Sequence, residues 1–384
     1  MRRGVCLCHK EVWNSSPSGG RSRRRSWMKA VILAAGQGTR LRPVTLTMPK
    51  PLVPVANQPL IAFAIDMLKN AGLREIGIVV NDLESPIRAQ LGDGSELGVS
   101  LDYIVQTEQL GLAHAVGLCE EFVDGQPFCV FLGDNIFQDK MQSLLREFEH
   151  SSAHASLALG EVSDPTRFGI AEIRDGNITR VVEKPKEPPS NLAIAGVYLF
   201  KPTIFEAIRN IKPSWRNELE ITDAIQWVIT AGYDVRSYIL SGWWIDAGKP
   251  DSIIQANQLV LGDLPYSPAP ESPDQIIGKC DISHRVLLGE NSQIIDSVVR
   301  GPVIIGKNVV IRNSYVGPYT SIGDNTVLED SEIEASIVMK GCIIRSIPGR
   351  IDSSLLADNS QVEAARHVPA AHKFILAENS YVQL

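Results

Sequence analysis

From residue 28 onward, short apolar runs of strand length alternate with segments that have the apolar spacing of a helix. The apolar runs lie at 29–35, 76–80, 100–106 and 128–132, and the helical segments lie at 58–71 and 111–122. Strands that are apolar on both faces and alternate with helices are typical of a parallel sheet covered by helices. Ligands bind at the carboxyl ends of such strands, so the loops after Ala35, Gln106 and Leu132 are the first places to look for a site.

Beyond about residue 150 the pattern changes to short strands with fewer helices. Further strands are predicted at 156–162, 168–173, 178–182 and 194–200, and helices at 220–231 and 251–261. We interpret this stretch as the second half of the same domain, folded over the first. The prediction for residues 28–262 is therefore one α/β domain with a Rossmann-like mixed sheet.

Residues 263–273 differ from what precedes them because four prolines occur within LPYSPAPESP at 264–273. Such a composition is typical of a linker. It predicts that residues 274–384 form a separate domain.

In that last segment apolar residues recur at steps of six, sometimes five. Thirteen positions follow this register: Ile276, Ile282, Leu288, Ile294, Val299, Ile305, Ile311, Val316, Ile322, Leu328, Ile333, Val338 and Ile344. Neither a helix nor a simple strand has this period, whereas a hexapeptide β-helix places one inward apolar residue on each short side of a triangular coil. We predict a left-handed parallel β-helix of hexapeptide repeats, with about 18 residues per coil and roughly four coils.

Residues 1–27 carry several arginines and show no apolar period. A signal peptide needs an apolar central region, which this stretch lacks. We expect a disordered extension, or one that is not translated, because Met28 begins a strong strand. A basic binding arm is the alternative.

Composition and charge narrow the function. The chain has 384 residues, a net charge of −7 and six cysteines. An acidic chain has no basic surplus for nonspecific binding of nucleic acid. No apolar run approaches the roughly 20 residues of a membrane span. The cysteines form no CxxC pair, which favours free thiols in a reduced compartment, so we expect a cytoplasmic protein without nucleic-acid or membrane partners.

The first candidate site is the glycine-containing turn after the first strand. Backbone N–H groups approach phosphate oxygens closely where side chains are absent, as at Gly36 and Gly38. A dinucleotide-binding fingerprint would need a third glycine where Leu41 stands, and a P-loop would need lysine where Thr39 stands.

Both of those motifs also begin a helix at once, which the prolines at 43, 49, 51 and 54 prevent. We therefore expect the loop to run extended across the top of the sheet and to carry Arg40 and Lys50 past bound phosphates. The alternative is a structural turn with surface cations.

Two aspartates are candidate magnesium ligands. Asp134 follows the strand at 128–132, and Asp246 lies in the segment WWIDAG at 243–248. Two carboxylates from distant segments can hold one Mg²⁺ while substrate phosphates complete its coordination. Asp134 alone could equally be a helix cap.

Glu183 and Lys184 end another predicted strand. Adjacent side chains alternate across a strand, so the two cannot both be simple surface residues unless the strand is an edge. Lys184 would supply a compact positive charge for a phosphate, and Glu183 would accept hydrogen bonds from sugar hydroxyls. An exposed salt bridge at a sheet edge is the alternative.

Taken together, these motifs resemble those of the sugar nucleotidylyltransferases over nearly all of residues 28–262. The resemblance rests on 33–40 (LAAGQGTR), Pro43, Thr45, 49–50, 52–54, Gln106, 111–115, 133–135, 168–169, 183–185, 195–198, 218–223 (ELEITD) and 244–248. The ELEITD segment, with 105–106 and 111–113, is more similar to thymidylyltransferases than to mannose guanylyltransferases. The hexapeptide tail and the ending YVQL match the long-form glucose-1-phosphate thymidylyltransferases (dTDP-glucose pyrophosphorylases).

One departure from the family pattern is Ala35, where many short-form members have glycine. A methyl group at this position narrows the approach to the nucleoside but should not abolish it.

The resemblance implies a magnesium-dependent transfer from dTTP to glucose 1-phosphate, giving dTDP-glucose and pyrophosphate, by a homo-oligomer. It implies catalytic roles for Arg40, Lys50 and Lys184. It implies nucleotide binding by Leu33, Ala35, Gly36, Gly38, Thr39, Arg40, Gln106, Gly111 and Asp134. It implies sugar-phosphate binding by Gly169, Glu183, Lys184, Tyr198 and Glu220, and Mg²⁺ binding by Asp134 and Asp246. Glu220 could instead interact with a helix dipole.

Two rival functions are weighed against this one. A UTP-dependent uridylyltransferase differs only in the nucleotide, because one methyl group in a pocket is worth about 1–3 kcal/mol. A non-catalytic regulatory or scaffold homologue would be expected to lose charged site residues, and Arg40, Lys50, Asp134, Lys184 and Asp246 are all present.

Overall fold

The computed structural model describes residues 28–364 and 380–382. The predictions for residues 1–27 lie outside the described residues. Within the described part of the chain, no helix is long and apolar enough to cross a membrane.

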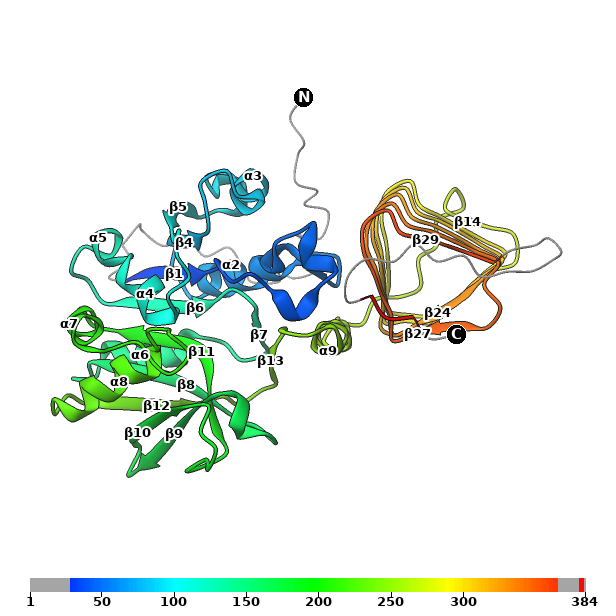
Figure 1. Cartoon of the computed structure of the whole chain (residues 1–384). Helices are drawn as coiled ribbons and strands as arrows, with labels where there is room; N and C mark the ends of the chain where they lie inside the picture. The colour runs from blue at the N-terminus through cyan, green and yellow to red at the C-terminus, as the bar shows by residue number, and fades with distance from the viewer. Residues whose placement is uncertain (1–27, 365–379, 383–384) are drawn as a thin grey trace.

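The first domain is built on one nine-stranded sheet with the order β5-β4-β1-β6-β11-β8-β12-β10-β9 (Figure 1). Its strands are β1 (Lys29–Leu33), β4 (Glu75–Val80), β5 (Ser100–Val105), β6 (Phe128–Leu132), β8 (Ala155–Glu161), β9 (Gly169–Arg174), β10 (Asn177–Glu183), β11 (Leu192–Phe200) and β12 (Val235–Ile239). Strands β5, β4, β1 and β6 are parallel, and β11 pairs antiparallel with both β6 and β8. The predicted mixed sheet is confirmed.

The second half of the domain does not fold over the first, as the sequence analysis expected. It extends the same sheet, because β11 pairs directly with β6. Residues 193–200 of β11 are all buried, so this strand needs cover on both faces and occupies the middle of the sheet rather than a separate layer.

Helices cover both faces of the sheet and enclose two hydrophobic cores. They are α2 (Leu60–Asn70), α3 (Pro86–Leu91), α4 (Leu112–Gly117), α5 (Glu120–Val123), α6 (Gln142–Glu149), α7 (Thr203–Asn210), α8 (Ile221–Thr230) and α9 (Pro250–Gly262). Helices α2 and α6 bury their apolar residues on one face, and α4, α7 and α8 on the other. The predicted helix at 111–122 is two shorter helices, and α3, α6 and α7 were not predicted.

A two-stranded ribbon lies outside the large sheet. Its strands, β7 (Asn135–Phe137) and β13 (Trp244–Asp246), pair antiparallel, with Asp246 opposite Asn135. The ribbon leads into α9, beside which the second domain lies in Figure 1. The chain between Gly262 and Ile276 forms no helix or strand.

The second domain is a three-sided parallel β-helix, in agreement with the predicted left-handed architecture. The first side has β14 (Ile276–Ile277), β17 (Gln293–Ile295), β20 (Val310–Arg312), β23 (Val327–Glu329), β26 (Ile343–Arg345) and β29 (Gln361–Glu363). The second side has β15 (Asp281–Ile282), β18 (Val298–Val299), β21 (Tyr315–Val316), β24 (Glu332–Glu334) and β27 (Arg350–Asp352). The third side has β16 (Val286–Leu288), β19 (Val303–Ile305), β22 (Thr320–Ile322), β25 (Ile337–Val338) and β28 (Leu355–Leu356).

The coil is tighter and the domain longer than predicted. Ile294 pairs with Ile311, and Ile311 with Leu328, so these coils have 17 residues, not the predicted 18. The described residues contain five coils and a sixth strand on the first side, where the sequence analysis expected roughly four coils. The shorter period arises because one side of each coil is covered in a step of five residues, as between Ile294 and Val299.

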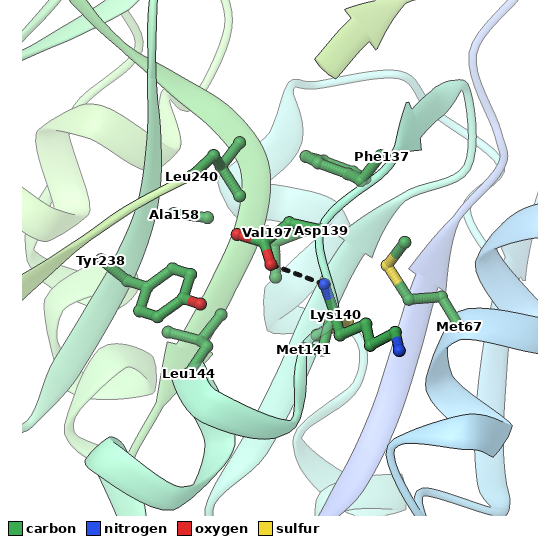
Figure 2. A pocket seen from close by; sticks show the side chains of 10 residues that line it. All are labelled: Met67, Phe137, Asp139, Lys140, Met141, Leu144, Ala158, Val197, Tyr238 and Leu240. Atoms are coloured by element: carbon green, nitrogen blue, oxygen red, sulfur yellow. Dashed lines mark hydrogen bonds between the residues drawn. The ribbon is translucent and has the colours of Figure 1, made fainter. Parts of the chain in front are cut away.

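Figure 2 shows a small apolar gap between α6 and the sheet, with Met67, Phe137 and Leu144 among the residues that line it. The cavity measures only about 10 Å³, about the minimum volume that holds one water molecule. Asp139 lies at this gap, where its carboxylate accepts hydrogen bonds from the backbone N–H groups of Lys140 (2.7 Å) and Ser241 (2.9 Å). The gap is a packing defect, not a ligand site.

Candidate functional site

The candidate site is a cavity of about 700 Å³ at the carboxyl ends of β1, β6 and β10. Most residues predicted to form a site line it: Leu33, Ala35, Gly36, Thr39, Arg40, Lys50, Gln106, Gly111, Asp134, Gly169, Glu183, Lys184, Tyr198 and Asp246. Gly38 and Glu220 are not among the lining residues. The position of the cavity agrees with the rule that ligands bind at strand carboxyl ends.

The glycine loop is not extended, as the sequence analysis expected. It forms three successive 3₁₀ turns at Thr39–Leu41, Val44–Leu46 and Lys50–Leu52. Prolines fix φ near −65°, which excludes a long helix but suits short turns of this kind. The compact path places both Arg40 and Lys50 on the cavity wall.

Gly38 supports this loop from behind the cavity. Its φ is +61°, and a Cβ atom there would lie 3.0 Å from the side chains of both Lys50 and Thr45. The Thr45 hydroxyl donates a hydrogen bond to the Gly38 carbonyl oxygen (2.8 Å). Gly38 therefore lets the chain pack closely beneath Lys50, and its predicted contact with the nucleotide stays a prediction.

A buried lysine lies between the two predicted metal ligands. The Lys50 ammonium forms an ion pair with Asp134 and lies 3.8 Å from Asp246 Oδ1. Asp134 does not cap a helix, because the chain continues directly into β7. The Ala247 N–H donates to the Asp134 carbonyl oxygen (3.0 Å), so pairing of β7 with β13 brings the two carboxylates together.

Neighbouring side chains hold this arrangement in place. The Asn135 amide donates to Asp134 Oδ1 (2.7 Å), and its own oxygen accepts from the Trp244 indole N–H (2.6 Å). Burial raises the pKa of the Asp246 carboxyl, and the negative charge of Asp134 raises it further, while Lys50 and other cations partly offset both effects. Two carboxylates thus share too little positive charge.

A divalent cation would suit these residues. Among the residues that the structure describes, no group of three or more histidine, cysteine or acidic side chains could hold a metal ion by itself. Mg²⁺ is commonly bound through one or two carboxylates together with substrate phosphates and water. Asp134 and Asp246 provide the two carboxylates, and the raised pKa of Asp246 indicates that added positive charge would stabilise its ionised form.

The opposite end of the cavity holds a second group of charges. Glu183 ends β10, and its carboxylate lies 3.2 Å from the Lys184 ammonium and 3.5 Å from the Arg216 guanidinium. Lys184, Glu183 and Arg216 all line the cavity. The edge-strand interpretation is therefore insufficient, because this ion pair faces a cavity rather than the outer surface.

Sequence reasoning missed Arg216. Its guanidinium also binds the carboxylates of Glu220 (2.7 Å) and Glu218 (3.1 Å). Burial acts to lower the pKa of Arg216, but Glu220, Glu218 and Glu183 more than offset it and the pKa is raised. Its position directly before the ELEITD segment was the available signal, since three acidic residues in that region require a countercharge.

Glu220 has a supporting position. It is 4% exposed and precedes α8, but its side chain makes no capping hydrogen bond. The carboxylate instead accepts from the Ser214 hydroxyl (2.7 Å) and from Arg216. Its predicted contact with the sugar stays a prediction; in this structure it orients Arg216.

The third region of the cavity contains amide groups. Gln106 Nε2 donates to the Gly111 carbonyl oxygen (3.3 Å) and lies 3.0 Å from His114 Nδ1. Gln109, which was not predicted, donates to the Ala35 carbonyl oxygen (2.7 Å). With its nitrogen engaged, the Gln106 amide has its oxygen available to accept a hydrogen bond from a base.

Replacing Gly111 by alanine is expected to destabilise the fold by about 2 kcal/mol or more. Its φ is +106°, and a Cβ atom would lie 2.5 Å from the Leu219 carbonyl oxygen. Thermal unfolding measures the effect. Gly36→Ala is the matched control, because a Cβ atom at Gly36 meets no atom within 4 Å, and its melting temperature should match that of the wild type. Equal melting temperatures for both variants would contradict the prediction.

Comparison with known proteins agrees with this geometry. Residues 29–262 match the family model described as nucleotidyl transferase. The chain is 43% identical to a glucose-1-phosphate thymidylyltransferase of Streptomyces griseus, over 93% of this chain and 99% of the relative. It is 39% identical to the UTP–glucose-1-phosphate uridylyltransferase AglF of Haloferax volcanii, over 60% of this chain and 96% of the relative.

A solved structure shares the first domain. It is that of a UDP-glucose pyrophosphorylase in complex with UDP-glucose, with a TM-score of 0.53 and 28% identity. The match covers 61% of this chain and 98% of that chain. The family model spans more than half of this chain, and the Streptomyces relative is covered over almost its whole length. The chain therefore belongs to the nucleotidyl transferase family.

Proposed function

We propose that the protein transfers a thymidylyl group from dTTP to glucose 1-phosphate, giving dTDP-glucose and pyrophosphate. The observation that carries the proposal is one cavity with two separate sets of phosphate-binding cations. Arg40 and Lys50 lie beside the paired aspartates, and Lys184 and Arg216 lie beside Glu183. Two phosphorylated substrates that react with each other need such an arrangement.

In the proposed reaction a phosphate oxygen of glucose 1-phosphate forms a bond to the α-phosphorus of dTTP. The bond from that phosphorus to the bridging oxygen breaks, and the electron pair leaves with pyrophosphate. The attacking oxygen is already ionised, so no general base is needed. Lys184 and Arg216 hold the acceptor phosphate in line, and Arg40 and Lys50 neutralise charge on the triphosphate.

Mg²⁺ is the proposed cofactor, held by Asp134 and Asp246. When bound, it would supply a Lewis acid that neutralises the phosphate oxygens around the reacting phosphorus. Lys50 keeps both carboxylates in one orientation through its ion pairs. The separation of the two aspartates from the Glu183 group lets each set of charges act on its own substrate.

The base is proposed to lie against Gln106. The N3–H group of thymine is a hydrogen-bond donor, and the Gln106 amide oxygen can accept from it. Cytosine presents an acceptor at that position and would be disfavoured. Leu33, Val79 and Leu112 line the cavity too and can pack on the base.

A uridylyltransferase is the second candidate, favoured by the similarity to the Haloferax uridylyltransferase. Thymine and uracil present the same edge to Gln106, so a methyl group alone distinguishes them. A pyrophosphate-release assay that crosses dTTP, UTP, dCTP, ATP and GTP with several sugar 1-phosphates tests both. Highest kcat/KM with dTTP and glucose 1-phosphate supports the proposal, and a preference for UTP would replace it with the second candidate.

Lys184→Ala is expected to raise the KM for glucose 1-phosphate about tenfold to a hundredfold, with a smaller effect on the KM for dTTP. A charge-assisted hydrogen bond to a phosphate is worth about 1.5–3 kcal/mol. Steady-state kinetics with each substrate varied in turn measures the two values. Lys186→Ala is the matched control, because Lys186 is a nearby exposed lysine that does not line the cavity. A KM for glucose 1-phosphate within twofold of wild type would show that Lys184 does not bind the acceptor.

A further inference from the structure

One face of the β-helix is covered by the first domain. Val303 and Ile305 point into the coil, so Ile304 between them points outward. Ile304 is nevertheless only 1% exposed, as is Ile337 on a neighbouring strand of the same side. Both belong to a hydrophobic cluster with α9. The two domains therefore share a core along the third side of the β-helix.

The segments that make this contact are direct continuations of the charged segments of the cavity. The turn that holds Lys50 runs into a hairpin formed by β2 (Pro54–Val55) and β3 (Gln58–Pro59). Similarly, β13 ends at Asp246, and α9 begins at Pro250. The hairpin and α9 both pack in the shared core. The β-helix thus contacts the two segments that determine where Lys50 and Asp246 lie.

A single side-chain amide joins these parts. Asn257 on α9 is fully buried, and its Oδ1 accepts a hydrogen bond from the Ala56 N–H in the hairpin (2.8 Å). Its Nδ2 donates to the Tyr319 carbonyl oxygen of the β-helix (2.9 Å). A buried amide with both ends bonded fixes the geometry of all three segments, because each partner would otherwise lose its hydrogen bond away from water.

The hairpin turn is shaped for this contact. Ala56 and Asn57 have φ values of 47° and 59°, which is uncommon for residues other than glycine. The left-handed turn presents the Ala56 N–H to Asn257, and the Asn57 amide donates to the Ile322 carbonyl oxygen (2.8 Å). Ile322 ends β22, the strand that follows Tyr319. Two hydrogen bonds thus connect hairpin and α9 to one coil.

We propose that Asn257 is a positioning residue for the transferase reaction: through it and the Ala56–Asn57 turn, the β-helix holds Lys50 in place relative to Asp134 and Asp246. The inference rests on the proposed function for its kinetic consequence. Catalysis by charge depends on preorganised geometry, and a displacement near 1 Å can cost about a hundredfold in rate.

The test uses the full chain with Asn257→Leu, which keeps the size of the side chain and removes both hydrogen bonds. The matched control is Ile337→Ala, which leaves a cavity in the same shared core and keeps the Asn257 contacts. For each variant, kcat and the KM of each substrate are measured, together with the melting temperature. Hydrogen–deuterium exchange at residues 50–60 is followed in parallel.

We expect Asn257→Leu to lower kcat about tenfold or more, with both KM values within about threefold of wild type. Ile337→Ala should lower the melting temperature and keep kcat within about twofold. Exchange at residues 50–60 should rise more in Asn257→Leu than in Ile337→Ala. A kcat within twofold of wild type in Asn257→Leu, or an equal loss in both variants, would overturn the proposal.

The outcome remains decisive if the proposed function fails. A wild-type protein that transfers no nucleotide to any sugar 1-phosphate would refute that function by itself. The exchange measurement does not depend on the substrates. Unchanged exchange at residues 50–60 in Asn257→Leu would then show that Asn257 does not hold the Lys50 segment.

Discussion

Asp134→Asn and Asp246→Asn are each expected to lower kcat about a thousandfold or more. Each variant removes one carboxylate from a divalent-cation site that has only two, and every tenfold loss corresponds to about 1.4 kcal/mol. Asparagine keeps the size of the side chain, so the fold should be retained. Steady-state kinetics at saturating Mg²⁺, with thermal unfolding alongside, measures both effects.

The double variant distinguishes a shared ion from two independent roles. If both aspartates act through one cation, Asp134→Asn with Asp246→Asn should be little worse than the more damaging single variant. Asp139→Asn is the matched control, because Asp139 lies in the same part of the chain but at the small apolar gap of Figure 2. Its kcat should stay near that of the wild type. Fully multiplicative losses in the double variant would contradict a shared ion.

Much of the fold could be predicted because its periods are simple. Strands such as β1 and β6 are apolar on both faces since the sheet is covered by helices, and this makes them visible as runs. The β-helix repeats one apolar position on each side of its coil. The even length of 18 residues was wrong because one side of each coil is a residue shorter, a detail already present in the steps of five.

The candidate site was predictable in composition but not in arrangement. Asp134 and Asp246 were both recognised, but only the pairing of β7 with β13 shows why they meet. These strands are three residues long, too short for a sequence pattern. Arg216 was missed because an arginine among acidic residues looks like a solvated charge cluster. Its role depends on Glu183, which lies far away in the chain and near in space.

The shape of the glycine loop could not be predicted by excluding other motifs. Prolines show that a helix cannot follow the loop, yet they suit both extended chain and 3₁₀ turns. The choice depends on tertiary contacts, in which Gly38 packs against Lys50 and Thr45. The same contacts bury Lys50, which the sequence analysis treated as equal to Arg40.

Burial now separates these two cations and gives the second large prediction. The Lys50 side chain is 8% exposed, whereas that of Arg40 is 56% exposed and lies 4.0 Å from Asp246. Lys50→Met is expected to lower kcat about a hundredfold to a thousandfold. The substitution removes a preorganised charge in a site that excludes water, where such a charge has its largest effect.

The dependence on Mg²⁺ identifies what Lys50 does. Lys50 is the countercharge of both aspartates in the absence of a metal ion. Removing it leaves two like charges that attract a divalent cation more strongly. The Mg²⁺ concentration that gives half-maximal rate should therefore fall or stay unchanged in Lys50→Met, although kcat is low.

The aspartate variants should behave in the opposite way, with a higher Mg²⁺ requirement, because they lose a ligand. Arg40→Met serves as the control for loss of a cation at the more exposed position, and should lower kcat about tenfold to a hundredfold. Titration of Mg²⁺ at saturating substrates gives all of these values. A raised Mg²⁺ requirement in Lys50→Met would show that Lys50 supports metal binding instead of acting on the phosphates.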